Sequence, residues 1–149
     1  LEYLLRGNMN KLDYAGDLLP AECWDILKED KNSQLIDCRT KAECQFTGVP
    51  NLEELEKITK FIEWQIYPSM VYNENFLSEI EQLGFSKYDK IILICRSGGR
   101  SKSAAEFLSS KGYESCFNCL NGFEGAHNLS GQRGQKDGWK FDGLPWKQT

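Results

Sequence analysis

The sequence predicts an α/β fold with a central parallel sheet of about five strands and helices on both faces. After Lys90, residues 91–94 form an unbroken apolar run that is rich in β-branched side chains and too short for a helix. Such a run is typical of a strand buried on both faces of a parallel sheet. Two glycines and a helix-forming run from Arg100 follow it, so a tight loop joins strand to helix. With 149 residues, the chain is long enough for one core and too short for two ordinary domains.

The other strands and helices follow in order along the chain. Pro20 suits the first turn of a helix, and Gly84 and Gly112 suit helix ends. Apolar residues recur at spacings of three between residues 51 and 60, which predicts a short amphipathic helix there. We predict strands at residues 14–18, 33–37, 61–66, 90–94 and 113–120, and helices at residues 20–28, 51–60, 75–83 and 100–111.

We assign residues 14–149 to a single domain that includes the C-terminal tail. Residues 1–13 are expected to be an N-terminal extension, partly foreign to the natural protein or disordered, with the natural start at Met9. The tail from residue 131 onwards is glycine-rich and polar, yet it ends in Trp139, Phe141 and Trp146. Aromatic side chains are costly to leave in water, so the tail is expected to fold back over the body.

Composition and charge narrow the classes of partner and the cellular compartment. The net charge of -4 argues against general affinity for nucleic acid, and no apolar run is long enough to cross a bilayer. We therefore expect neither a nucleic-acid nor a membrane partner. Six cysteines would suit three disulfides, but a chain with this much hydrophobic periodicity does not need them. Reduced thiols and a cytoplasmic location are expected.

Cys23 is predicted to pack in the core, and Cys116 and Cys119 are not expected to form a site. Cys23 lies on the apolar face of the helix at residues 20–28. Cys116 and Cys119 are three residues apart in a strand, so their side chains point to opposite faces and cannot chelate an ion together. His127 is the single histidine, which leaves a zinc site short of ligands. We expect no metal.

The loop after residues 90–94 is the predicted active site. Unpaired N–H groups at the start of the following helix carry partial positive charge, and Arg96, Arg100 and Lys102 add full charges. This setting favours the thiolate of Cys95, which is the reactive form of a cysteine. The alternative is that Cys95 is simply a small buried apolar residue, but glycines and arginines at this spacing serve no packing purpose. The catalytic candidate is Cys95, and the substrate-binding candidates are Arg96, Ser97, Gly98, Gly99, Arg100 and Ser101.

Residues 95–101 resemble the active-site loop of rhodanese sulfurtransferases. Residues 37–43 are similar to the Asp-x-Arg-x-x-x-Glu signature of that family, and residues 122–125 and 143–146 resemble the ending of bacterial single-domain members. The resemblance spans residues 14–146 and implies a three-layer rhodanese-like fold. One departure concerns the rim of the pocket, and so the substrate: residues 48–50 read Gly-Val-Pro where many members have Gly-His-Ile, and a longer connection follows.

The resemblance implies a thiosulfate sulfurtransferase with a two-step reaction. Cys95 takes the outer sulfur of an anionic donor such as thiosulfate and holds it as a persulfide. A thiol or cyanide acceptor, or a sulfur-carrier protein, then takes that sulfur, with no metal or organic cofactor. Arg96 and Arg100 are expected to position the oxyanion of the donor, while the loop amides stabilise the persulfide.

Further candidates follow the strand at residues 33–37, on the side of the sheet where Cys95 is expected. Asp37 is predicted to accept hydrogen bonds from loop amides, and Arg39 to pair with Glu43 along a short helix, so that these residues brace the loop. Direct contact of these residues with the substrate is the alternative. Trp64 is either a core residue or a wall of the pocket.

Three other functions stay open. Phosphatases and arsenate reductases on a similar fold carry Cys-x5-Arg loops, one residue longer, whereas Arg100 follows Cys95 by five positions, and the loop contains no acidic residue as a general acid. A non-catalytic or sulfur-carrying binding module is the second alternative, although modules that only dock a partner commonly lack the nucleophile. The third is redox sensing by an exposed, reactive thiol.

Overall fold

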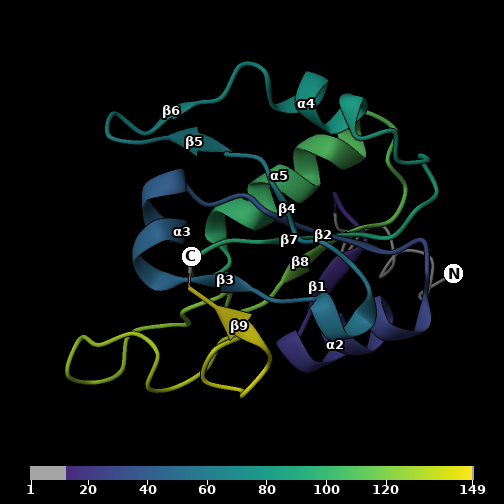
Figure 1. Cartoon of the computed structure of the whole chain (residues 1–149). Coiled ribbons are helices and arrows are strands. Elements are labelled where there is room, and N and C mark those ends of the chain that lie inside the picture. Colours follow the sequence, from purple (N-terminus) through teal and green to yellow (C-terminus); the bar gives the residue numbers. More distant parts are fainter. Residues whose placement is uncertain (1–12, 149) are drawn as a thin grey trace, which may run out of the picture.

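The central sheet is built around β7 (Ile91–Ile94), all four residues of which are buried. In the computed structural model, which describes residues 13–148, β8 (Cys116–Cys119) and β2 (Gln34–Asp37) flank this strand, and β1 (Gly16–Leu18) and β4 (Lys60–Phe61) form the edges. All pairings are parallel, in the order β1-β8-β7-β2-β4 (Figure 1). The predicted five-stranded parallel sheet is confirmed. The predicted N-terminal extension lies outside the described residues, apart from its last residue.

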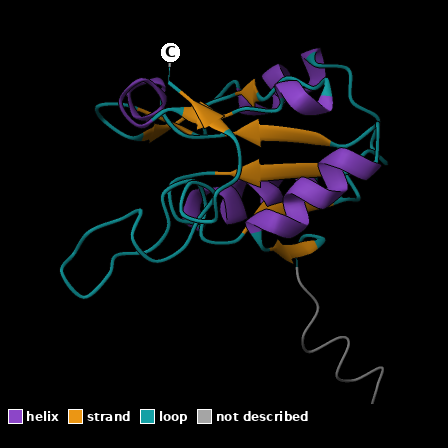
Figure 2. Ribbon diagram, turned by 60° about the horizontal axis from the view of Figure 1, so that its bottom comes forward, coloured by secondary structure: helices purple, strands orange, loops and turns teal. Residues whose placement is uncertain are grey.

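Helices cover both faces of this sheet (Figure 2). Side chains of β7 alternate between the faces: Ile91 and Leu93 belong to one buried cluster, and Ile92 and Ile94 to the other. The first cluster is closed by α4 (Phe76–Gln82) and α5 (Gly99–Ser110), and the second by α2 (Pro20–Glu29). The three-layer α/β architecture is therefore as predicted.

Most predicted elements are confirmed with slightly different ends, but the helix at residues 51–60 is wrong. Only a 3-10 turn, η1 (Glu53–Leu55), forms there, because Glu56 has a φ of 57° and ends it. Of the apolar residues that predicted a helix, Leu52 is buried but Ile58 is 72% exposed. A stripe with so little burial does not gain enough apolar contact to hold a longer helix.

The strand predicted at residues 61–66 is also wrong, since the segment is divided between two sheets. Its start belongs to β4, and its end forms β5 (Gln65–Ile66), which pairs antiparallel with β6 (Val71–Tyr72) outside the central sheet. Trp64 lies between them and packs edge-on against Phe76, with ring centroids 5.0 Å apart. Trp64 therefore packs with the core on the α4 and α5 side.

The C-terminal tail folds back as predicted. Trp139 is fully buried, and its Nε1 donates to the carbonyl of Pro145 at 2.8 Å. Farther on, β9 (Trp146–Lys147) pairs antiparallel with β3 (Val49–Pro50). Phe141 remains 52% exposed, so Trp139 is the tail residue that anchors the segment in the core.

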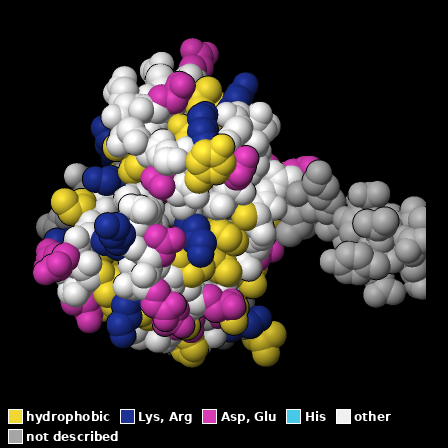
Figure 3. Space-filling view, turned by 90° about the vertical axis from the view of Figure 1, so that its right-hand side faces the viewer, with side chains coloured by type: hydrophobic (Ala, Val, Ile, Leu, Met, Phe, Trp, Pro, Cys, Tyr) yellow, Lys and Arg dark blue, Asp and Glu magenta, His cyan; other side chains and the backbone are white. Residues whose placement is uncertain are grey.

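The buried cysteines lie where the pattern places them. Cys23 is fully buried against the sheet, and Cys116 and Cys119 belong to the clusters on opposite faces. All six cysteines are free thiols. Within residues 13–148, no helix is both long and apolar enough to span a bilayer. On the face shown in Figure 3, basic and acidic side chains are interspersed.

Candidate active site

The loop that follows β7 curls around the sulfur of Cys95. Gly98 has a φ of 108°, a conformation that side chains other than glycine rarely adopt, and α5 begins at the next residue. The amides of Gly98 and Ser101 point at Sγ, from 3.2 and 3.3 Å, and the Ser101 hydroxyl lies 3.1 Å from it. Three donors therefore converge on one sulfur, as the predicted anion cradle requires.

The sulfur is more enclosed than an exposed redox-sensing thiol would be. Cys95 is only 1% exposed, whereas Arg96, Ser97 and Gly99 on the outer side of the loop are exposed. The nucleophile candidate thus lies at the floor of the loop. An oxidant, like a sulfur donor, can therefore reach Sγ only when the outer side of the loop moves.

The turn after β8 holds the loop in this orientation. The carbonyl of Cys95 accepts from the amide of Phe123 at 2.8 Å, and the carbonyl of Arg96 accepts from Glu124 at 3.0 Å. With these carbonyls held outward, the loop amides are free to face inward. Gly122 allows the close approach, because a Cβ there would lie 2.5 Å from the carbonyl oxygen of Cys95.

Arg100 does not present a free charge to the pocket. Its Nη1 and Nη2 each bond a separate oxygen of Glu43 at 2.7 Å, which makes a two-pronged ion pair between α5 and α3 (Lys41–Thr47). The hydrogen bonds of Glu43 raise the pKa of Arg100. Burial opposes ionisation of Glu43, but the bonds and charge of Arg100 outweigh it and lower the pKa of Glu43 to about 2.

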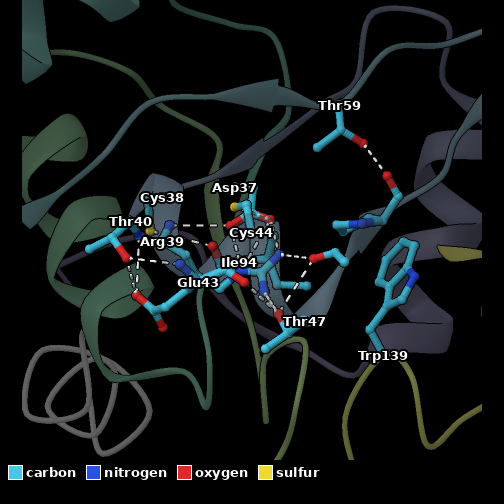
Figure 4. Close-up of polar contacts among 12 residues, drawn as sticks. Asp37, Cys38, Arg39, Thr40, Glu43, Cys44, Thr47, Thr59, Ile94 and Trp139 are labelled. Atoms are coloured by element: carbon cyan, nitrogen blue, oxygen red, sulfur yellow. Dashed lines mark hydrogen bonds and ion pairs between the residues drawn. The ribbon is translucent and has the colours of Figure 1, made fainter. Parts of the chain in front are cut away.

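The predicted pairing of Arg39 with Glu43 is therefore wrong. Arg39 instead forms a fully buried ion pair with Asp37, with Nη2 and Oδ2 2.6 Å apart (Figure 4). Its Nη1 also donates to Thr47 Oγ1 at 2.7 Å, and its guanidinium lies 4.3 Å from the ring centre of Phe123. Burial opposes the charge of Arg39, but the bonds of Asp37 prevail and raise its pKa.

This Arg39 cluster joins three segments around the loop. Asp37 ends β2, Thr47 ends α3, and Phe123 belongs to the turn that bonds the Cys95 carbonyl. Asp37 also accepts from the amide of Arg39 at 3.2 Å, which is the kind of loop-amide bond predicted for it. The predicted i,i+4 pair of Arg39 with Glu43 does not form, because a buried charge requires a full set of partners. Asp37 and the carbonyl of Gly48 supply those partners.

A pocket of about 660 Å³ opens on the outer side of the loop. Arg96 and Arg100 line it together with apolar side chains of α3 and of the segment between β5 and β6. Phe46 is 82% exposed and Tyr67 62% exposed in that lining. Trp64 is not among the lining residues, so the pocket-wall alternative for it does not apply to this pocket.

Sequence reasoning missed Asn118, which lies behind the loop. Its side chain is buried in β8, and Oδ1 accepts from Ser101 Oγ at 2.5 Å. Asparagine is depleted in strands, so an asparagine inside this otherwise apolar strand was the available signal. Among residues 13–148, no group of three His, Cys, Asp or Glu side chains is arranged to hold a metal ion.

Comparison with known proteins points to one family. The chain matches the family described as Rhodanese-like domain over residues 19–129. The uncharacterized protein RP600 homolog of Rickettsia rickettsii is 35% identical over 131 residues, or 88% of this chain and 96% of the relative. The crystal structure of Rv0390 from M. tuberculosis superposes with a TM-score of 0.83 at 37% identity, over 91% of this chain and 99% of that one. The polysulfide-sulfur transferase homodimer of Wolinella succinogenes shares the fold, with a TM-score of 0.61 at 16% identity over 99% of this chain and 88% of that one. The chain belongs to the rhodanese-like family.

Proposed function

We propose that the protein is a sulfurtransferase that carries sulfane sulfur as a persulfide on Cys95. The observation that carries the proposal is the convergence of the Gly98 amide, the Ser101 amide and the Ser101 hydroxyl on one sulfur, at 3.1 to 3.3 Å. Donors aimed at a sulfur stabilise it as a thiolate, which is the nucleophilic form. Membership of the rhodanese-like family supports the same reaction class.

In the first half-reaction, the thiolate of Cys95 attacks the outer sulfur of a donor such as thiosulfate. A new S–S bond forms while the bond to the sulfonate sulfur breaks, and sulfite leaves with that electron pair. The negative charge now resides on the terminal sulfur of the persulfide. We expect backbone amides of the same loop to stabilise that charge.

In the second half-reaction, an acceptor thiolate or cyanide attacks the terminal sulfur. The bond between the two sulfurs breaks, and Cys95 Sγ leaves as a thiolate, which restores the starting enzyme. The products are an acceptor persulfide or thiocyanate. No metal or organic cofactor enters either step.

The two arginines of the loop take different roles in this proposal. Glu43 already satisfies the guanidinium of Arg100, so Arg100 positions the loop against α3. Arg96 is exposed, lines the pocket and forms no ion pair within the described part of the chain, so its charge is available to the oxyanion of the donor. Access to Sγ requires movement of the exposed outer loop residues, because Cys95 is 1% exposed.

The pocket supports an organic thiol as the physiological acceptor. Its volume of about 660 Å³ lies in the range of pockets that hold organic ligands. Its exposed aromatic residues offer apolar contact to an organic thiol, which cyanide is too small to use. Phe46 and Tyr67 are placed to contact the body of such a thiol, while Arg96 attracts an acidic group on it.

Mass spectrometry tests the proposal directly. After incubation with thiosulfate, we expect the peptide that contains Cys95 to gain the mass of one sulfur atom, and Cys95→Ser to gain none. Cys44→Ser is the matched control, because burial and the charge of Asp37 raise the pKa of the Cys44 thiol to about 12 and leave it unreactive. This control variant should still form the adduct.

Two results would overturn the assignment. One is a sulfur adduct that persists in Cys95→Ser, which would place the reactive thiol elsewhere. The other is hydrolysis of an aryl phosphate that Cys95→Ser abolishes, which would favour phosphatase chemistry. The ion pair of Arg100 with Glu43 argues against the latter, because a phosphatase needs that guanidinium for its substrate.

A further inference from the structure

Behind the loop, a line of hydrogen bonds leads from Cys95 to the edge of the sheet. The Ser101 hydroxyl lies 3.1 Å from Cys95 Sγ and 2.5 Å from Asn118 Oδ1. Asn118 Nδ2 in turn donates to Asp17 Oδ1 at 2.9 Å, across the register pair that joins β8 to β1. Ser101 and Asn118 are buried, whereas Asp17 lies at the exposed edge of the sheet. These contacts join the sulfur to a carboxylate on another strand.

The hydroxyl of Ser101 has two acceptors but only one proton to donate. It can donate to Cys95 Sγ or to Asn118 Oδ1, and the other acceptor then goes without that bond. The amides of Gly98 and Ser101 face Sγ whichever way the hydroxyl turns. The hydroxyl is therefore the one adjustable donor of the three that surround the sulfur.

The orientation of Asn118 is determined by Asp17. An ionised carboxylate only accepts hydrogen bonds, so the amide nitrogen must face Asp17 and the amide oxygen must face Ser101. Tyr14 donates to the same carboxylate oxygen at 2.8 Å. Burial and the contact with Asp17 raise the pKa of Tyr14 to about 12, so the phenol stays a donor. Because an amide keeps its protons near neutral pH, Asn118 orients the hydroxyl and does not relay a proton.

We propose that Asn118, oriented by Asp17, is a positioning residue that lets the Ser101 hydroxyl switch between two acceptors. When Cys95 is a thiolate, the charged sulfur is the stronger acceptor and the hydroxyl donates to it. When Sγ is neutral, as a thiol or as the inner sulfur of a persulfide, the hydroxyl turns to Asn118 Oδ1. Neither state leaves the buried hydroxyl proton without an acceptor.

The catalytic consequence rests on the proposed function. In the first half-reaction, negative charge moves from Sγ to the terminal sulfur, and the hydroxyl moves from Sγ to Asn118. In the second, Sγ becomes the leaving group, and the hydroxyl returns to stabilise the charge that develops on it. The switch thus follows the charge in both directions of the sulfur transfer.

Other charged and titratable groups near Cys95 also bear on its protonation, and Asn118→Leu and Ser101→Ala leave them unchanged. Cys38 has a raised pKa because it is buried and close to Cys95, and Cys119 has a raised pKa through Cys23, burial and the charge of Cys95, so both thiols stay neutral. Arg100 is charged and paired with Glu43. The groups held constant in Asn118→Leu and Ser101→Ala are Cys38 just after β2, Cys119 on β8, Arg96 and Arg100 of the loop and α5, Glu43 on α3, and Asp17 on β1.

Alkylation of Cys95 by iodoacetamide across a range of pH tests the switch, since the rate follows the thiolate fraction. Asn118→Leu removes the competing acceptor at similar volume, so the hydroxyl stays on Sγ. The midpoint of the curve of alkylation rate against pH then moves to lower pH. Ser101→Ala removes the donor, so the midpoint moves to higher pH. Below both midpoints, we expect about a tenfold difference in rate between the two variants. Ser103→Ala, an exposed serine on the same helix, should match the parent chain.

Opposite shifts are the result that a merely structural role does not produce, because general loosening of the site would move both variants alike. Shifts in the same direction, or an unshifted Asn118→Leu, would overturn the proposal. Should Asn118→Leu fail to fold, Asp17→Asn at the exposed edge frees the Asn118 amide to turn and should lower the midpoint, in low and high salt alike. A shift that vanishes in high salt would then count against the switch. Alkylation needs no sulfur donor. Its result therefore tests the switch even if no persulfide forms on Cys95.

Discussion

Two arginines follow neighbouring strands of the sheet, and their surroundings differ. Arg39, after β2, is paired with Asp37, and neither side chain has any exposed area. Arg100, after β7, is paired with Glu43, and these side chains are 17% and 22% exposed at the pocket. Both pairs join an arginine to a carboxylate, yet their different burial gives them different contributions to stability. Arg39 holds the fold around the site, whereas Arg100 holds one loop of it.

Breaking the buried pair should have the largest effect. Arg39→Met leaves the carboxylate of Asp37 buried without its charged partner, which we expect to lower the free energy of unfolding by about 3–5 kcal/mol. Denaturant unfolding measures it. Lys147→Met, which breaks the exposed pair with Glu53, is the matched control and should cause no measurable loss. Equal losses in the two variants would show that burial does not set the difference.

The pair at the pocket should have a smaller and pH-dependent effect. Glu43→Gln removes one charge, and we expect a loss of about 1 kcal/mol at neutral pH, allowing for partial exposure. The pKa of Glu43 is lowered from 4.5 to about 2, so its contribution is fully present above 4.5 and is lost as pH falls towards 2. The free energies of unfolding of the parent chain and of Glu43→Gln should therefore converge as the pH falls from 4.5 to about 2. A constant gap down to pH 2 would contradict the assignment.

Arg96, which is exposed and lines the pocket, should affect the reaction and not the fold. Arg96→Ala is expected to lower kcat/KM for thiosulfate by about tenfold, mainly through KM, because it removes a charge-assisted bond to the donor. Stability should change by less than about 0.5 kcal/mol, since the residue is exposed. Lys102→Ala removes an exposed cation that does not line the pocket and should leave the KM unchanged. If both variants raised the KM equally, Arg96 would act only through long-range electrostatic attraction of the donor and not through a direct bond.

The apolar wall should give the smallest effect. Phe46→Ala removes an exposed ring from the pocket, and we expect KM for an aromatic thiol acceptor to rise a few-fold while turnover with cyanide stays the same. Steady-state kinetics with the two acceptors measure it. Phe141→Ala, a half-exposed ring of the tail, is the control. Similar losses with both acceptors would argue that Phe46 does not contact the thiol.

Much of the site could be predicted because it is contiguous. The strand, the cysteine and the glycine loop are neighbours along the chain, and their geometry depends on local backbone preferences. The predicted inward amides were found at Gly98 and Ser101 for this reason. The segment from residue 51 to residue 66 could not be predicted in the same way, because its short apolar pattern fits several structures and burial chooses between them.

The sequence by itself determined the α/β class, the loop that encloses Cys95 and the burial of Trp139 in the returning tail. Only the tertiary structure decided which acid pairs with which arginine, and that Asn118 stands behind Ser101. The reason is physical. Backbone preferences act between neighbours along the chain, whereas a buried charge or polar group takes whichever partner the packed segments bring within hydrogen-bond distance.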